Sequence, residues 1–118
     1  MKTKISLSGM EFWAHIGCFE EERVIGTKFK VDVSFFYDAA TAAETDDLTQ
    51  AVNYQEVYSV VKSVMATPAQ LLEHVAHNIV KELKKRFQQI SDLKVTIRKL
   101  NPVLGGKTAE AAVTMTGN

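Results

Sequence analysis

The segment from Phe29 to Tyr37 constrains the fold of this chain most strongly, because apolar and polar side chains alternate along most of it. A period of two is typical of a β-strand with one buried face and one exposed face. The apolar positions are Phe29, Val31, Val33, Phe35 and Tyr37, and the polar residues between them are Lys30, Asp32 and Ser34. Such a strand requires neighbouring strands and a layer that covers its apolar face.

Three further segments show the same period and predict three more strands. The first covers residues 3–10 and should pair in antiparallel orientation with the strand described above. The last two cover residues 93–99 and 109–115, and the loop between them contains a proline and two glycines. The chain therefore begins and ends with a pair of strands.

Two helices are predicted between these pairs. The first should begin at Asn53, whose side chain can cap the free N–H groups while Glu56 completes a capping box. The second should have Thr67 as its N-cap and Pro68 in its first helical position. The apolar stripe of the first helix is Val57, Val60, Val61 and Val64, and that of the second is Leu72, Ala76, Ile79, Leu83 and Phe87.

This order of elements predicts an α+β fold. Each helix has a single apolar stripe, so both should lie on one face of a four-stranded antiparallel sheet in the order ββααββ. Residues 39–52 show no sustained period and are expected to form a loop or a frayed turn. The opposite face of the sheet is polar, so it requires water or another subunit as its neighbour.

Composition limits the function classes. The 118 residues fit one domain covering 1–118, and the formal net charge of zero gives no electrostatic footprint for nucleic acid or an anionic membrane. A small-molecule ligand is the better expectation. Cys18 is the single cysteine, which excludes an intrachain disulfide framework, and neither a signal peptide nor a membrane-spanning run is evident. We expect a cytoplasmic protein.

Lys99 stands out because it occupies an inward position in the strand 93–99, where Leu93, Val95 and Ile97 precede it on the same face. Burial lowers the pKa of a lysine towards values that suit proton transfer, although a lysine at a strand end can also extend into solvent. Glu73 falls beside Val80 at the edge of the second apolar stripe and should be half buried.

Other motifs do not support a site. Gly106, Lys107 and Thr108 resemble the end of a P-loop, but the first glycine of that motif is replaced by Asn101 and a strand follows. His74 and His77 should point away from the apolar stripe of their helix, which disfavours a zinc site shared with His15. The basic residues Lys81, Lys84, Lys85 and Arg86 are best interpreted as a solvated helix face.

Taken in order and spacing, several segments resemble bacterial dihydroneopterin aldolases over nearly the whole chain. The matching segments are Gly9–Gly17 (GMEFWAHIG), Glu22 followed by Ile25-Gly26, Phe29–Val33 (FKVDV), Asn53-Tyr54, Leu71–His74 (LLEH) and Lys99–Pro102 (KLNP). The resemblance implies the tunnelling fold, in which four subunits join their sheets into a ring, two rings stack into a homo-octamer, and the active sites lie between subunits.

The resemblance also implies a reaction. In this family 7,8-dihydroneopterin undergoes retro-aldol cleavage of its C1′–C2′ bond in folate biosynthesis, giving glycolaldehyde and 6-hydroxymethyl-7,8-dihydropterin. The C6=N5 imine of the substrate accepts the electron pair, so neither a metal, another cofactor nor a lysine Schiff base is required. Epimerisation at C2′ by the same enzyme is a further expectation.

Each unusual residue receives a role from this resemblance. Lys99 is the general acid/base, Tyr54 supplies a hydroxyl for protonation or positioning, and Glu22 orients the substrate hydroxyls and the catalytic water. Glu73 anchors the pterin through its carboxylate, with Leu72 completing the pocket. Val52 is also expected to contact the substrate.

Two alternatives remain open from the sequence. A dihydroneopterin triphosphate epimerase shares this chemistry but requires a basic pocket beside Glu22, for which Arg23 and Lys107 are available. A non-catalytic assembly module, in which Glu73 and Lys99 form an interface salt bridge, is the other. Asn53 and the His15-Ile16-Gly17 run depart from some family members, and neither departure affects the four principal roles.

Overall fold

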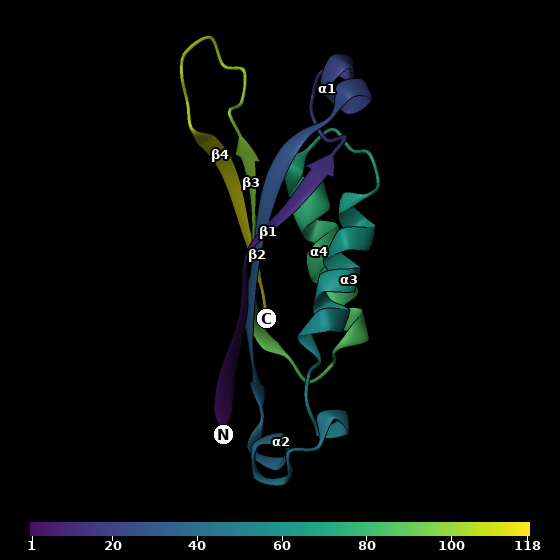
Figure 1. The fold of residues 1–118 in the computed structure, drawn as a ribbon, viewed down its shortest axis with the longest axis vertical. Coiled ribbons are helices and arrows are strands. Elements are labelled where there is room, and N and C mark those ends of the chain that lie inside the picture. The colour runs from purple at the N-terminus through teal and green to yellow at the C-terminus, as the bar shows by residue number, and fades with distance from the viewer.

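The computed structural model describes residues 1–118 and shows a four-stranded antiparallel sheet in the order β1-β2-β3-β4. Two long helices, α3 and α4, cover one face of the sheet (Figure 1). The molecule is elongated, with extents of 53 × 24 × 21 Å. The predicted fold class is confirmed. The elements are β1 (Lys2–Ala14), α1 (Glu20–Ile25), β2 (Thr27–Asp38), α2 (Ala40–Thr45), the 3₁₀ turn η1 (Leu48–Gln50), α3 (Tyr54–Met65), α4 (Leu72–Arg86), β3 (Ser91–Leu100) and β4 (Glu110–Gly117).

The central strand β2 alternates as its sequence predicts, and its apolar side chains are buried from Phe29 to Tyr37. Strand β1 pairs with it in antiparallel orientation and extends beyond the expected end at Met10. A bulge makes this extension possible, because Gly9 adopts a φ of 69° and its N–H donates to the Asp32 carboxylate at 2.7 Å. The bulge shifts the register and lets β1 continue to the loop that carries α1.

Helix α3 starts where the sequence predicts, since the Asn53 side chain accepts a hydrogen bond from the Gln55 N–H at 2.9 Å. The predicted capping box is wrong, because Glu56 forms an ion pair with Arg86 of α4 at 3.3 Å instead. Val57 and Val61 are buried together with Met65, which the predicted stripe omitted.

The predicted start of the second helix is also wrong. Helix α4 begins at Leu72, and the segment with Thr67 and Pro68 forms a connection instead. The cause is a short parallel bridge between Ile16 and Ala69. The Gly17 N–H donates to the Ala69 carbonyl at 3.0 Å and the Ala69 N–H donates to the His15 carbonyl at 3.3 Å, so these backbone groups cannot enter a helix.

The buried face of α4 differs slightly from its predicted stripe. It consists of Val75, Ala76, Ile79 and Leu83, while Leu72 is half buried and Phe87 is buried just beyond the helix end. Residues 39–52 are more ordered than expected, since they contain α2 and η1. These changes leave the two-layer arrangement intact, with one cluster of 21 buried side chains between sheet and helices.

The uncovered face of the sheet is polar. Arg98 and Asp32 form an ion pair across β2 and β3 at 3.0 Å, and the hydroxyls of Thr96 and Thr114 lie 2.9 Å apart. Strands β1 and β4 are the two edges of the sheet, and neither edge has a partner strand within the chain. None of the helices has the length and apolar character needed to cross a membrane.

Candidate active site

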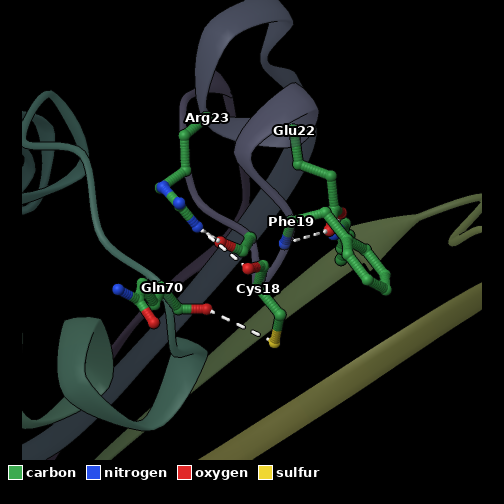
Figure 2. A network of polar contacts seen from close by, with 7 residues as sticks. Cys18, Phe19, Glu22, Arg23 and Gln70 are labelled. Atoms are coloured by element: carbon green, nitrogen blue, oxygen red, sulfur yellow. Dashed lines mark hydrogen bonds and ion pairs between the residues drawn. The ribbon is translucent and has the colours of Figure 1, made fainter.

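The connection between β1 and β2 folds back on itself and presents Glu22 from the short helix α1 (Figure 2). The Trp13 indole donates to the Ile25 carbonyl at 3.1 Å, and Nδ1 of His15 lies 3.0 Å from the Arg23 carbonyl. The Arg23 guanidinium donates to the carbonyls of Gly17 and Cys18 at 2.8 and 3.0 Å. These bonds tie both ends of the connection together.

The two carboxylate oxygens of Glu22 have different partners. Oε1 accepts a hydrogen bond from the Phe19 N–H at 3.3 Å, and Oε2 contacts the Lys99 ammonium. The side chains of Lys99 and Glu22 are only 14% and 24% exposed. This ion pair joins residues 77 positions apart, so it brings together two of the predicted catalytic residues.

Lys99 reaches this position from the inward face of β3. Its neighbours across the sheet are Phe29, which is fully buried, and Ala111. Burial of the ammonium lowers the pKa of Lys99 below its ordinary value, and the electrostatic effect of the nearby Cys18 opposes this shift. The lysine predicted from strand periodicity is therefore a half-buried amine whose neutral form is easier to reach than that of a surface lysine.

The Glu22 side chain packs closely against the backbone of Gly17. A Cβ at this position would lie 2.5 Å from Cβ and 2.8 Å from Oε1 of Glu22, so a larger residue leaves no room for the observed side chain. The close approach requires the absence of a Cβ rather than an unusual backbone conformation. Gly17 is therefore a candidate site position to which the sequence alone assigned no role.

We expect Gly17→Ala to reduce both stability and turnover. A glycine-to-alanine change without steric conflict stabilises by about 0.4–1 kcal/mol, but overpacking costs about 1–3 kcal/mol and here displaces Glu22 from Lys99. Urea unfolding and steady-state assays measure the two effects. Gly106→Ala is the matched control, since nothing lies within 4 Å of a Cβ there. Unchanged turnover of Gly17→Ala would contradict the support role of this glycine.

The start of α4 lies at the same end of the molecule as α1 (Figure 1). The bridge between Ile16 and Ala69 holds the two connections together, and the Cys18 thiol lies 3.7 Å from the Gln70 carbonyl. Leu72 and Glu73 follow directly in the first turn of α4. Glu73 is exposed rather than half buried, because α4 begins at Leu72 instead of Pro68 and Glu73 therefore lies in its first turn.

Tyr54 and Val52 lie at the opposite end of the helix layer. Helix α3 starts at Tyr54 and runs for 12 residues towards the end that carries α1, a rise of about 18 Å. The Tyr54 side chain is 58% exposed, whereas Val52 is buried. Within one chain, the structure thus brings Glu22 and Lys99 into contact near Leu72 and Glu73, and it leaves Tyr54 apart.

The histidines do not form a cluster of possible metal ligands. His74 and His77 are exposed, and Nε2 of His74 lies 3.3 Å from the Asn78 amide nitrogen. No group of three or more His, Cys, Asp or Glu side chains is close enough to hold a metal ion.

Comparison with known proteins identifies the family of this chain. The family model for dihydroneopterin aldolase matches residues 5–116. The chain belongs to the dihydroneopterin aldolase family. These are lyases of folate biosynthesis, and the predicted family and enzyme class are confirmed.

Individual relatives agree with this assignment. The chain is 35% identical over 114 residues to the dihydroneopterin aldolase of Bacillus subtilis, covering 96% of this chain and 95% of the relative. It is 37% identical over 107 residues to that of Staphylococcus epidermidis strain RP62A, with 90% and 88% covered. The crystal structure of Escherichia coli dihydroneopterin aldolase in complex with neopterin superposes with a TM-score of 0.91 at 21% identity, covering 98% of this chain and 99% of that one. The tunnelling fold is confirmed.

Proposed function

We propose that this chain cleaves the C1′–C2′ bond of 7,8-dihydroneopterin, with Lys99 as the general acid/base and Glu22 as its partner. The observation that carries this assignment is the contact of the half-buried Lys99 with the Glu22 carboxylate. A half-buried amine with a lowered pKa can take up and return a proton more readily than a surface lysine, which the reaction requires. The pterin ligand is supported by family membership and by the neopterin complex of the Escherichia coli enzyme.

The cleavage removes one proton from the 2′-hydroxyl and returns one proton to C1′. The neutral Lys99 amine accepts the proton of the 2′-hydroxyl, directly or through a water held by Glu22. The C1′–C2′ electron pair then moves into a C1′=C6 double bond and onto N5, and C2′ leaves as the aldehyde carbon of glycolaldehyde. Protonation of C1′ restores the C6=N5 imine and yields the 6-hydroxymethyl product, and the Tyr54 hydroxyl is the proposed donor or positioning group for this step.

Glu73 is the proposed anchor for the pterin ring. Its exposed carboxylate lies in the first turn of α4, beside the connection that carries Glu22. A carboxylate can accept two parallel hydrogen bonds from the 2-amino group and N3–H of a pterin. Leu72 is proposed to complete this part of the pocket.

We expect Glu73→Gln to weaken pterin binding more than tenfold, because the amide N–H₂ faces a ring donor where the carboxylate accepted a hydrogen bond. A fluorescence titration with a non-cleavable pterin measures the effect. Glu82→Gln, a change on the same helix, serves as the control. Wild-type affinity of Glu73→Gln would reject the anchor role.

We further propose that the complete site forms between subunits. Tyr54 and Val52 lie one helix length from Glu22 and Lys99, so a substrate-sized site with all four requires a second chain. The free edges of β1 and β4 offer a head-to-tail contact that can close into a ring. A four-subunit ring, and an octamer of two rings, are the proposed assemblies, which native mass spectrometry tests.

The alternative substrate, a triphosphate, finds less support. Arg23 was one of the two predicted cations beside Glu22, and its guanidinium donates to the Gly17 and Cys18 carbonyls. The other, Lys107, is exposed in the loop between β3 and β4. Within one chain Lys99 pairs with Glu22 rather than with Glu73, which supports the catalytic proposal over a non-catalytic module with an interface pair of Glu73 and Lys99. An assay of glycolaldehyde release from 7,8-dihydroneopterin tests the proposal, and formation of the C2′ epimer alone would contradict it.

A further inference from the structure

Helix α1 is held in place by polar contacts rather than by packing. It has six residues and none of them is buried. Its apolar side chains Val24 and Ile25 are 71% and 68% exposed. A helix this short is unstable by itself, so its position depends on the hydrogen bonds that tie it to the rest of the chain.

Arg23 takes part in three of these contacts. Nη1 of its side chain donates to the carbonyls of Gly17 and Cys18 (Figure 2). The carbonyl of Arg23 itself lies 3.0 Å from Nδ1 of His15. Charged donors make stronger hydrogen bonds than neutral ones. Arg23 therefore links the beginning of the connection to the last turn of α1.

The segment that Arg23 holds also determines where Glu22 points. Gly17 lies against the Glu22 side chain, and Phe19, directly after Cys18, donates its N–H to Glu22 Oε1. We propose that Arg23 is a positioning residue: it fixes the Gly17–Phe19 backbone and thereby keeps the Glu22 carboxylate in contact with Lys99. This inference rests on the proposed function of Glu22 and Lys99.

Arg23→Met keeps the length and the aliphatic part of the side chain and removes its donors. We expect kcat to fall about tenfold or more, since small misplacements of catalytic groups have effects of that size. KM should change less than threefold, because the proposed pterin anchor is on α4 and not on α1. Arg23→Lys should recover most of the lost turnover, since an ammonium can donate to both carbonyls. Arg86→Met, which removes a surface pair with Glu56, is the matched control.

A double-mutant cycle with Glu22→Gln distinguishes positioning from other roles. If Arg23 acts through Glu22, the double variant should be no slower than Glu22→Gln alone. Multiplying effects, or no gain of Arg23→Lys over Arg23→Met, would overturn the inference. So would a rise in KM without a loss of kcat, which indicates direct contact with substrate.

Glu22→Gln alone distinguishes failure of the proposed role of Glu22 from failure of the positioning role of Arg23. If it retains wild-type turnover, the proposed role of Glu22 fails, and the positioning role fails with it. If it is impaired while Arg23→Met is not, only the inference about Arg23 is wrong. Thermal unfolding shows whether each variant folds. Should Arg23→Met not fold, Arg23→Gln replaces it in the same comparisons, with the same expected results.

Discussion

Lys99→Ala should lower the single-turnover rate of dihydroneopterin cleavage about 10²-fold or more, the usual effect of losing a general acid/base. The fold should survive, because removing one partner of even a fully buried ion pair costs about 3–5 kcal/mol, this pair is only partly buried, and typical unfolding free energies are about 5–15 kcal/mol. Rapid mixing with bound substrate gives the rate, and circular dichroism checks the fold. Lys62→Ala, an exposed lysine on α3, is the matched control.

Lys99→Arg tests whether Lys99 is needed for its positive charge or for proton transfer. A guanidinium keeps the positive charge beside Glu22, but its pKa above about 12 prevents it from acting as a base near neutral pH. The Arg variant should therefore be nearly as slow as the Ala variant. If it cleaves substrate at close to the wild-type rate, Lys99 has an electrostatic role and the proton is carried by Tyr54, Glu22 or water.

The pH dependence of the wild-type rate tests the same role. Because the base is the neutral amine, the rate should rise with pH through the pKa of Lys99, which burial lowers. The Glu22 carboxylate favours the ammonium form, so Glu22→Gln should move this rise to lower pH. Both Lys99 variants should lose this limb of the profile. A rise that persists in Lys99→Ala would assign it to another group.

Local patterns explain why the strands and Lys99 could be predicted from the sequence. A strand period of two shows which face each residue occupies, so the inward position of Lys99 followed directly from its neighbours Val95 and Ile97. The start of α4 depends on a bridge between Ile16 and Ala69, which are far apart in sequence, and no local signal reports such a contact. The same late start explains why Glu73 was predicted on the correct helix but with the wrong burial: it lies in the first turn of α4.

The connection around α1 had no periodicity to interpret. The family resemblance named Glu22, but its contact with Lys99 depends on a glycine five positions earlier and on the Arg23 side chain. Arg23 stands next to Glu22 in the sequence and was considered only as a ligand for phosphate. Its position next to Glu22 made Arg23 a candidate for the site. Only the fold shows that its guanidinium faces the backbone of the connection between β1 and β2.

Mixing two inactive variants should restore activity if sites are shared. Tyr54→Ala chains keep the end with Glu22 and Lys99, and Lys99→Ala chains keep the end with Val52 and Tyr54. The two ends are separated by the length of α3, about 18 Å, so one chain cannot supply both to one substrate. After subunit exchange in a 1:1 mixture, about one site in four should receive two intact ends.

The control mixture combines Lys99→Ala with Glu22→Gln. These residues contact each other within one chain, so exchange cannot place an intact Glu22 beside an intact Lys99 from the same chain. That mixture should show no more than the mean activity of its two components, even when native mass spectrometry shows mixed oligomers. Equal recovery in both mixtures would mean that mixing restores activity by stabilising the variant oligomers and not by completing shared sites. No recovery with Tyr54→Ala despite mixed oligomers would mean that Tyr54 does not complete the site of a neighbouring chain.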